Sequence, residues 1–393
     1  MNYLTKCVAC GEGGLIPFLD LNEQPLANSY HSGEELQKYP LGLRVCVSCW
    51  HTQLPVAVNP ALMFETYLYV SGTSQTMRDY CDDLAVMIAE REGKTGKVFD
   101  IGCNDGTQLD SFKKIGWETY GCDPAKNLTQ TALDKGHNVK RDWWGGDYGG
   151  PMFDVITAQN VFAHTEDPLG FLRAVKDHLK PDGTCYIQTS QSQMYQRNEF
   201  DTTYHEHISF FCANSMKTLT ERAGLTLTRI DITSIHGDSY LFTLKHPGSE
   251  AHASVQETID KEISEGRHDI KFYMNFGKNA KKIINALKLF VDHIRSEGYQ
   301  VVGYGAAAKG MTLLNSNDIQ LDWIVDDNPL KQGLYTPGTN IIIKDKSSLD
   351  VDDALFVIPL AWNFFEEIKK NVEEIRGNRE TKYIKYFPKL DVA

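Results

Sequence analysis

Four side chains that handle protons stand in consecutive positions of one segment, residues 200–211 (FDTTYHEHISFF). They are Tyr204, His205, Glu206 and His207. Histidine titrates near neutral pH, and a neighbouring carboxylate can fix its tautomer and raise its basicity. In an extended strand Tyr204 and Glu206 would face one side and the two histidines the other, whereas a turn would bring three of the four groups toward one pocket. The cluster predicts general acid–base chemistry.

A glycine loop after a predicted strand offers a site for an adenosyl ligand. The strand at 97–102 (KVFDIG) leads into the loop that holds Gly102, Asn104 and Gly106, and a helix is expected to start near Thr107. Glycine lets a ligand approach the backbone, and the polarised helix N-terminus stands behind it. The D-x-G-x-x-x-G spacing differs from the dinucleotide pattern G-x-G-x-x-G and favours an adenosyl group without a pyrophosphate.

Polar residues after two further strands complete this predicted cofactor site. Asp123 ends the next strand, 17 residues after Gly106, where a carboxylate can accept hydrogen bonds from both ribose hydroxyls. Asn160 follows the fourth strand on the crevice side of the sheet, and His164 can face the same crevice. A glycine turn alone is weak evidence, but together with Asp123 and Asn160 it resembles class I S-adenosylmethionine-dependent methyltransferases.

Two other interpretations of the Tyr204–His207 cluster stay open. The His-x-His spacing of His205 and His207 also suits a di-zinc or iron site, but the sequence offers no further carboxylate–histidine set to complete one. The same residues would suit a polar interface between domains, because each histidine alone is more often structural. We prefer catalysis because the groups form a cluster beside a predicted methyl-donor site.

Two cysteine pairs predict a metal site near the N-terminus. Cys7 and Cys10 form one C-x2-C pair, and Cys46 and Cys49 form the other. Such pairs place four thiolates tetrahedrally around one Zn²⁺. The 35 residues between the pairs exceed the usual spacing, but a longer loop adds little closure entropy. Four thiolates leave no open coordination position, so the zinc is predicted to be structural. His51 is a weaker alternative ligand and is expected at the surface.

Hydrophobic periodicity divides the chain into three expected domains and predicts the α/β fold class. Residues 1–66 lack helical periodicity and predict a small, loop-rich zinc-binding domain. In residues 67–247 strands and helices alternate, which predicts a mainly parallel sheet covered on both faces, a class I, Rossmann-like methyltransferase domain. Residues 248–393 start with an amphipathic helical lead at 251–297 and repeat a strand–glycine–helix pattern at 299–308, which predicts a second Rossmann-like α/β domain. A helix is expected at 169–179, and strands at 97–102, 118–123, 153–159, 183–189, 321–325, 341–343 and 354–359.

Composition limits the classes of function. Hydrophobic residues make up 41% of the 393 residues and charged residues 23%, as in ordinary globular proteins. No apolar run is long enough to cross a bilayer and the start lacks the features of a signal peptide, so a cytoplasmic location is expected. The net charge of −12 disfavours binding to nucleic acid but allows a small anionic ligand. No long apolar docking helix is evident, so a monomer is expected.

Five motifs stand in one order along the chain and resemble one family. They are the zinc cysteines, DIGCNDG (100–106), YHEH (204–207), IHGDS (235–239) and GYGAAAKG (303–310). The set resembles the nucleotide-sugar C-methyltransferases that make branched-chain deoxysugars, over essentially the whole chain. The resemblance implies three domains, S-adenosylmethionine as methyl donor, and a methyl acceptor at C3 of a 4-keto sugar linked to a nucleoside diphosphate, with dTDP favoured.

Carried over position by position, the resemblance implies a catalytic set. It falls on Tyr69, His164, Tyr204, Glu206 and His207. His207 would remove the C3 proton, which the neighbouring ketone makes acidic, and Glu206 would orient or tune its imidazole. Tyr204, Tyr69 or His164 would donate a hydrogen bond to the enolate oxygen. The carbanion would then attack the sulfonium methyl.

The C-terminal domain is expected to hold the nucleotide. Tyr304, Gly305, Ala306 and Lys309 stand where a strand turns into a helix, a natural diphosphate site. Spacing alone leaves open that the glycines only permit tight packing and that Lys309 is solvated. The residues expected to contact the substrate are His205, His236, Tyr304, Lys309 and Lys331.

Two stretches depart from the family pattern. Members often carry Gly-Gly where this chain has 236–238 (HGD), and Glu-x-Pro where it has 188–190 (QTS). Both stretches lie near the expected pocket, so they bear on the identity of the sugar. The alternatives are an O-methyltransferase acting on a nucleotide sugar or another small metabolite, and a non-catalytic sugar-nucleotide-binding protein. An RNA methyltransferase is disfavoured because no basic patch with interleaved aromatics is present.

Overall fold

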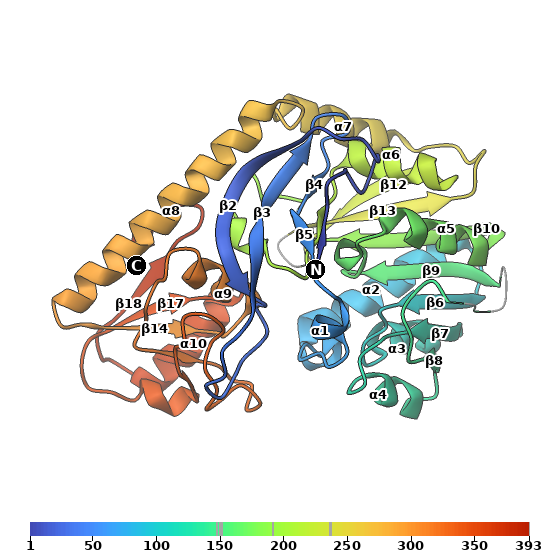
Figure 1. Ribbon diagram of the computed structural model, residues 1–393. Coiled ribbons are helices and arrows are strands. Elements are labelled where there is room, and N and C mark those ends of the chain that lie inside the picture. The colour runs from blue at the N-terminus through green and yellow to red at the C-terminus, as the bar shows by residue number, and fades with distance from the viewer. Residues whose placement is uncertain (147, 149–151, 191, 236–237, 393) are drawn as a thin grey trace.

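The computed structural model describes the chain except residues 147, 149–151, 191, 236–237 and 393. Figure 1 shows a central hairpin from the N-terminal region between two α/β units, with the long helix α8 running along one side. Sheets of two, four, six and seven strands make up the described β-structure. The predicted α/β class with two Rossmann-like units is confirmed. Among the described residues no helix is both long and apolar enough to span a membrane.

The seven-stranded sheet forms the central unit. Its order is β12-β13-β10-β9-β6-β7-β8, and only β13 runs antiparallel to its neighbours. Its strands are β6 (Lys97–Ile101), β7 (Glu118–Cys122), β8 (Asn138–Lys140), β9 (Phe153–Gln159), β10 (Leu179–Thr189), β12 (Thr226–Thr233) and β13 (Ser239–Lys245). Its helices are α2 (Gln75–Glu92), α3 (Thr107–Lys114), α4 (Thr129–Asp134), α5 (Pro168–His178) and α6 (Ala213–Ala223). The expected strands are all present, although β10 starts earlier and carries a bulge between Leu179 and Thr184.

Capping residues explain where these helices begin and end. At α5, the Asp167 side chain accepts a hydrogen bond from the Gly170 N–H at 2.9 Å, and Pro168 occupies the first helical position. Helix α6 ends at Gly224, whose φ of 72° is a left-handed conformation that glycine adopts without steric cost.

The zinc-binding region contains more β-structure than its sequence predicts. Strands β2 (Leu15–Pro25) and β3 (Lys38–Cys46) form a long antiparallel hairpin that fills the interval between the cysteine pairs. Bulges interrupt the alternation of its side chains, which is why the pattern was not visible. The short elements here are β1 (Asn2–Tyr3), β4 (Thr52–Gln53), β5 (Val56–Ala57) and α1 (Ala61–Phe64). The prediction that His51 lies at the surface is wrong: it is fully buried and packs on Phe211, with ring centroids 4.8 Å apart.

The C-terminal unit is a six-stranded sheet of order β16-β15-β14-β17-β18-β19, parallel except at β19. Its strands are β14 (Gln300–Tyr304), β15 (Trp323–Val325), β16 (Ile343–Lys344), β17 (Leu355–Pro359), β18 (Thr381–Lys385) and β19 (Asp391–Val392). The helical lead is two helices, α7 (Ala253–Ser264) and α8 (Ile270–Ser296), and α9 (Ala308–Asn315) and α10 (Phe365–Arg376) follow. Helix α8 lies on β2 at Gly277, where a Cβ atom would collide with the Phe18 carbonyl oxygen.

The segment that holds the Tyr204–His207 cluster contacts all three regions. It starts with a 3-10 turn, Phe200–Thr202, and ends in β11 (Ser209–Phe210), which pairs with β4. The Thr312 hydroxyl of α9 donates to the Thr203 carbonyl at 3.0 Å. The Trp362 indole donates to Asp201 at 2.8 Å. The fold therefore holds this segment between the central sheet, the zinc-binding region and the C-terminal unit.

Candidate active site

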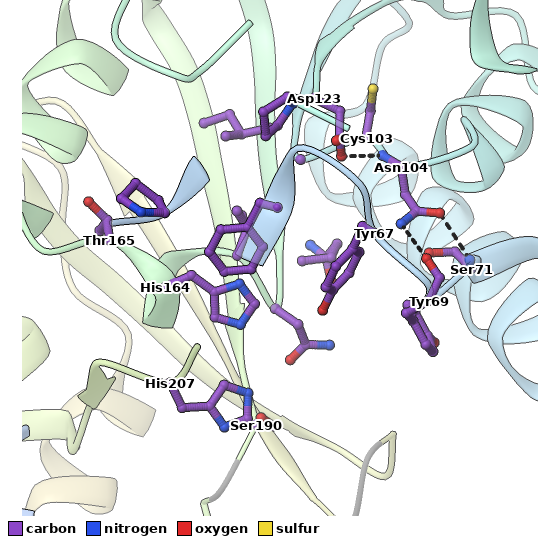
Figure 2. A pocket seen from close by; sticks show the side chains of 18 of the residues that line it. Tyr67, Tyr69, Ser71, Cys103, Asn104, Asp123, His164, Thr165, Ser190 and His207 are labelled. Atoms are coloured by element: carbon purple, nitrogen blue, oxygen red, sulfur yellow. Dashed lines mark hydrogen bonds between the residues drawn. The ribbon is translucent and has the colours of Figure 1, made fainter. Parts of the chain in front are cut away.

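A cavity of about 660 Å³ lies at the carboxyl ends of β6, β7 and β9, the edge where open α/β sheets bind ligands. The start of α9 and residues 361, 363 and 364 of the C-terminal unit also line it, as do Val58, Pro60 and Phe64 of the zinc-binding region. Figure 2 shows Asp123 and Asn104 next to each other at the top of this space, and His164 and His207 below them. The cavity is large enough for a cofactor and part of a substrate.

The loop after β6 turns through left-handed backbone conformations. Gly102, Asn104 and Gly106 have φ of 69°, 53° and 84°. The Asn104 side chain accepts a hydrogen bond from the Ser71 N–H and donates one to the Tyr69 carbonyl, each at 3.0 Å (Figure 2). Gly102 and Asn104 line the cavity, whereas Gly106 packs against His137 and shapes the turn from behind. Asn104 thus holds the 69–71 segment beside the loop.

Asp123 is bound to the backbone and still faces the cavity. Its carboxylate accepts hydrogen bonds from the N–H of Asn104 at 2.9 Å and from that of Ala125 at 2.8 Å. Burial raises the pKa of this carboxyl group. A carboxylate has about four lone-pair sites, so two remain for the hydroxyls of a ribose.

Two buried amide side chains at the same edge of the sheet each have one polar atom without a partner among the described residues. Within the described part of the chain, Gln159 Nε2 and Asn160 Oδ1 have no hydrogen-bond partner, and both residues line the cavity. The Asn160 amide nitrogen donates to Gln188 Oε1 at 3.2 Å, which fixes the free oxygen's direction. Unpaired buried polar atoms are costly, so these two atoms fit a ligand with donors and acceptors of its own, as S-adenosylmethionine has.

Stacked rings form the wall next to the cofactor loop. The His164 ring lies between Phe64, with centroids 5.2 Å apart, and His207, with centroids 5.3 Å apart. Tyr204 packs on the other side of His207 at 4.1 Å. Burial lowers the pKa of His164 to about 4, so this imidazole is neutral near pH 7. All four rings line the cavity.

The Tyr204–His207 segment forms a turn and not an extended strand. The His207 N–H donates to the Tyr204 carbonyl at 2.9 Å, and the Tyr204 hydroxyl lies 2.9 Å from His207 Nε2. His207 Nδ1 lies 2.8 Å from the Thr202 carbonyl oxygen, which can only accept. The Nδ1 atom therefore carries the proton, and Nε2 accepts a hydrogen bond from the Tyr204 hydroxyl at the cavity.

Glu206 makes its hydrogen bonds away from this imidazole. Its carboxylate accepts from the Asn28 amide at 2.6 Å and from the Tyr67 hydroxyl at 3.1 Å. Burial raises its pKa to about 7. Glu206 was expected to orient the His207 imidazole, but the Thr202 carbonyl makes that contact. Glu206 instead connects Asn28 of the hairpin region to Tyr67.

The residues expected at the substrate fall into two groups. Lys309 lines the cavity, with its ammonium 4.3 Å from the centre of the Trp362 ring. His205 instead contacts the Tyr39 carbonyl at 3.3 Å, the Tyr304 hydroxyl donates to Asp327 at 3.0 Å, and Lys331 donates to the Ala306 carbonyl at 2.8 Å. These three do not line the cavity, and His236 lies outside the described residues. Tyr69 lines it and is 44% exposed.

Sequence reasoning overlooked several cavity residues. The sequence analysis assigned a role to Tyr69 but none to Tyr67, which stands two positions before it. Thr202 acts through its carbonyl, which no side-chain pattern reveals. Glu199 and Trp143 also line the cavity without forming part of any recognisable spacing.

The four predicted zinc ligands come together. The Sγ atoms of Cys7, Cys10, Cys46 and Cys49 all lie within 4.8 Å of one another. Two of the sulfur–sulfur distances are 3.6 and 3.5 Å. A tetrahedral zinc with Zn–S bonds of about 2.3 Å places its sulfurs about 3.8 Å apart, so the set fits zinc with no open position. The cluster packs on α6, where the Asn214 amide donates to the Cys49 carbonyl at 3.1 Å.

The Rossmann-like sheet, the strand-end carboxylate and the glycine loop define a class I S-adenosylmethionine-dependent methyltransferase. Three family models match successive parts of the chain: "Putative zinc binding domain" at residues 7–64, "Methyltransferase domain" at 73–230 and "C-methyltransferase C-terminal domain" at 234–388. The C-methyltransferase NovU of Streptomyces niveus is 28% identical over 95% of this chain and 94% of its own length. The chain belongs to the S-adenosylmethionine-dependent C-methyltransferases built from these three domains, with structural zinc in the first.

Other similar proteins match a smaller share of the chain. The mitochondrial ubiquinone biosynthesis O-methyltransferase of Schizosaccharomyces pombe is 27% identical over 32% of this chain and 50% of its own length. Among solved structures, magnesium protoporphyrin IX methyltransferase from Synechocystis PCC 6803 with bound SAM covers 43% of this chain and 79% of its own, with 14% identity and a TM-score of 0.34.

Proposed function

We propose that the enzyme methylates C3 of a 4-keto-deoxysugar carried on a nucleoside diphosphate, with dTDP favoured, and that His207 is the base. The observation that supports this most is the position of His207, which lines the cavity with Nδ1 bound to the Thr202 carbonyl and with Nε2 next to the Tyr204 hydroxyl. C-methylation requires a positioned base that removes the proton from carbon, and a neighbouring ketone that makes this proton acidic. Methylation of a hydroxyl group does not require the ketone.

The proposed reaction begins with removal of the C3 proton. The ketone makes this hydrogen acidic because the carbanion delocalises into an enolate. His207 Nε2 takes the proton, and the imidazolium that forms keeps its Nδ1–H bond to Thr202. S-adenosylmethionine, which Asp123, Asn160 and the 102–106 loop would hold, would supply an electrophilic methyl group to the C3 carbanion and leave as S-adenosylhomocysteine. The cavity orients the two reactants, which lowers the entropic part of the barrier.

The enolate oxygen needs hydrogen-bond donors. The Tyr204 hydroxyl, 2.9 Å from His207 Nε2, is placed to turn to the ketone oxygen when the C–H group takes its position at the imidazole. A neutral His164 is the second candidate, and Tyr69 the third. One well-placed donor of this kind is worth about 2.7–4 kcal/mol in the transition state.

The nucleotide diphosphate is proposed to bind at the start of α9. This eight-residue helix has no side-chain cap, so the first amides of the helix are available to an anion, and Lys309 adds a positive charge in the cavity. The assignment to the substrate stays a prediction for three residues that do not line the cavity: Tyr304, Lys331 and His205. His236 stays a prediction as well.

Each of the three regions of the chain has its own role in the proposed function. Residues 1–66 bind zinc and brace the catalytic turn, residues 67–247 bind the methyl donor, and residues 248–393 bind the nucleotide. It retains the expected monomeric state and cytoplasmic location.

Solvent deuterium exchange at C3 of the acceptor tests the role of His207. Wild-type enzyme with a methyl-donor analogue that cannot react should exchange this hydrogen, and His207→Asn should abolish both exchange and methylation. Exchange at the wild-type rate in the variant would remove His207 from the role of base. O-methylation is the second candidate, because part of the chain is also similar to a ubiquinone biosynthesis O-methyltransferase. It would persist on an acceptor analogue that lacks the ketone.

A further inference from the structure

Glu199 lines the cavity in the segment that precedes the catalytic turn. It is 5% exposed, and the Lys309 ammonium is close enough to lower the pKa of its carboxyl group. The side chain therefore lies in the part of the cavity between the catalytic turn and the C-terminal unit. None of the steps proposed above uses it.

The backbone on both sides holds this side chain in place. Asn198 has a left-handed φ of 58°, and the Glu199 N–H donates to the Met194 carbonyl at 2.8 Å. Phe200, the next residue, is fully buried in the core. A residue fixed on both sides cannot swing its carboxylate to solvent without disturbing this packing.

The Glu199 carboxylate is poorly satisfied by the protein. Its nearest ionic contact is Arg197 Nη1 at 3.9 Å, and the other terminal nitrogen of Arg197 is bound to Asp238 at 2.6 Å. In the part of the chain that the structure describes, no hydrogen bond to the Glu199 carboxylate is present. Burial raises its pKa to about 7. A nearly buried carboxylate without donors is costly, and a ligand that supplies a donor removes this cost.

We propose that Glu199 is a specificity-determining residue that accepts a hydrogen bond from the C2 hydroxyl group of the acceptor, the ring position next to the methylated carbon. The inference rests on the proposed function. The sugar has to reach His207 while its diphosphate lies near Lys309, and Glu199 lines the same cavity as both residues. Sites built to bind a substrate hydroxyl reject analogues that lack it, because the buried acceptor is then left unpaired.

Two acceptor probes that differ by one ring hydroxyl test this inference. They are dTDP-4-keto-6-deoxyglucose and its 2-deoxy counterpart, each assayed for methylation by wild type, Glu199→Gln and Glu199→Ala. Wild type should prefer the hydroxylated probe in kcat/KM by at least about tenfold, and Glu199→Ala should lose most of this preference. Glu199→Gln, which keeps one acceptor oxygen, should fall between them. The exposed Glu118→Gln variant is the control and should keep the wild-type ratio.

The outcomes separate this inference from the proposed function. Methylation of both probes with a ratio that is the same in wild type and Glu199→Ala would overturn the inference and leave the function in place. A wild-type enzyme that favours the 2-deoxy probe would also overturn it. If neither probe is methylated while S-adenosylmethionine still binds, both the inference and the proposed function are overturned. Cofactor affinity measured in each variant shows whether the fold is intact.

Discussion

Asp123 and Asp326 occupy matching positions in the two Rossmann-like sheets of this chain. Asp123 accepts a hydrogen bond from the backbone N–H of Asn104 at 2.9 Å, and Asp326 accepts one from that of Ala306 at 2.7 Å. The second oxygen of each carboxylate accepts from the N–H two residues further along the chain, at 2.8 Å in both cases. In each sheet, an aspartate after the second strand therefore accepts a hydrogen bond from the turn that follows the first strand.

The two carboxylates differ in what they face. Asp123 lines the cavity, whereas Asp326 lies 3.4 Å from the ammonium of Lys331, which also donates to the Ala306 carbonyl. The Tyr30 hydroxyl donates to that same carbonyl at 2.5 Å. The chain's own side chains thus occupy the second turn, so only Asp123 is available to a ribose.

This difference predicts that Asp123→Asn weakens binding of S-adenosylmethionine and Asp326→Asn does not. Loss of a charged acceptor to a ribose hydroxyl should reduce affinity by roughly tenfold or more, since hydrogen bonds to charged groups contribute about 1.5–3 kcal/mol. Titration calorimetry with S-adenosylmethionine measures both variants. Equal losses in the two would contradict the assignment of Asp123 to the cofactor.

Removal of the Tyr204 hydroxyl should impair the chemical step. Tyr204→Phe is expected to lower kcat by about 10²–10³-fold, the effect of losing one donor to an enolate oxygen. Binding of S-adenosylmethionine should be unchanged. Tyr195→Phe is a matched control, because that hydroxyl is also buried but donates to Thr52 outside the cavity. If both variants keep the wild-type kcat, Tyr204 has no catalytic role.

Loss of the zinc should destabilise the site from a distance. Cys46→Ser is expected to reduce bound zinc from one ion per chain and to lower Tm, because the cysteine cluster packs on α6 and next to the β4–β11 pairing. Elemental analysis and thermal unfolding measure the two effects. Cys185→Ala removes another fully buried cysteine and should retain the metal. Full zinc content in Cys46→Ser would contradict the ligand assignment.

Glu206 should make the protein less stable as the pH rises. Its folded pKa is raised by burial to about 7 from 4.5. The unfolded chain therefore releases this proton first, and stability falls with pH through that window by up to about 3 kcal/mol. Glu206→Gln removes this titration, so its Tm relative to wild type should increase between pH 5 and pH 8. A Tm difference that is constant over this range would contradict the raised pKa.

The sequence predicted the parts of the site that depend on local spacing. The cysteine pairs, the 102–106 loop and Asp123 each follow from a short pattern, and the structure brings each set together. The inner strands of both Rossmann-like units were predictable because buried parallel strands appear as apolar runs. The sequence analysis did not predict β8, β12, β13, β18 or β19, which lie toward the sheet edges.

Long-range contacts explain what the sequence could not predict. Glu206 binds Asn28, which is 178 positions away, and this pairing depends on where the β2–β3 hairpin lies. His51 was expected at the surface, yet it is covered by Phe211, which is 160 positions further along the chain. The Lys331 contact with Asp326 likewise depends on the path of the chain after β15.

The product of the reaction tests the central claim most directly. Pure enzyme is incubated with S-adenosylmethionine labelled with ¹³C in the methyl group and with a panel of nucleoside diphosphate 4-keto-6-deoxysugars. The account predicts that one panel member gains a single methyl group, and that NMR places this group on the ring carbon next to the ketone. A methyl group on oxygen, or no transfer to any member while the cofactor still binds, would contradict it.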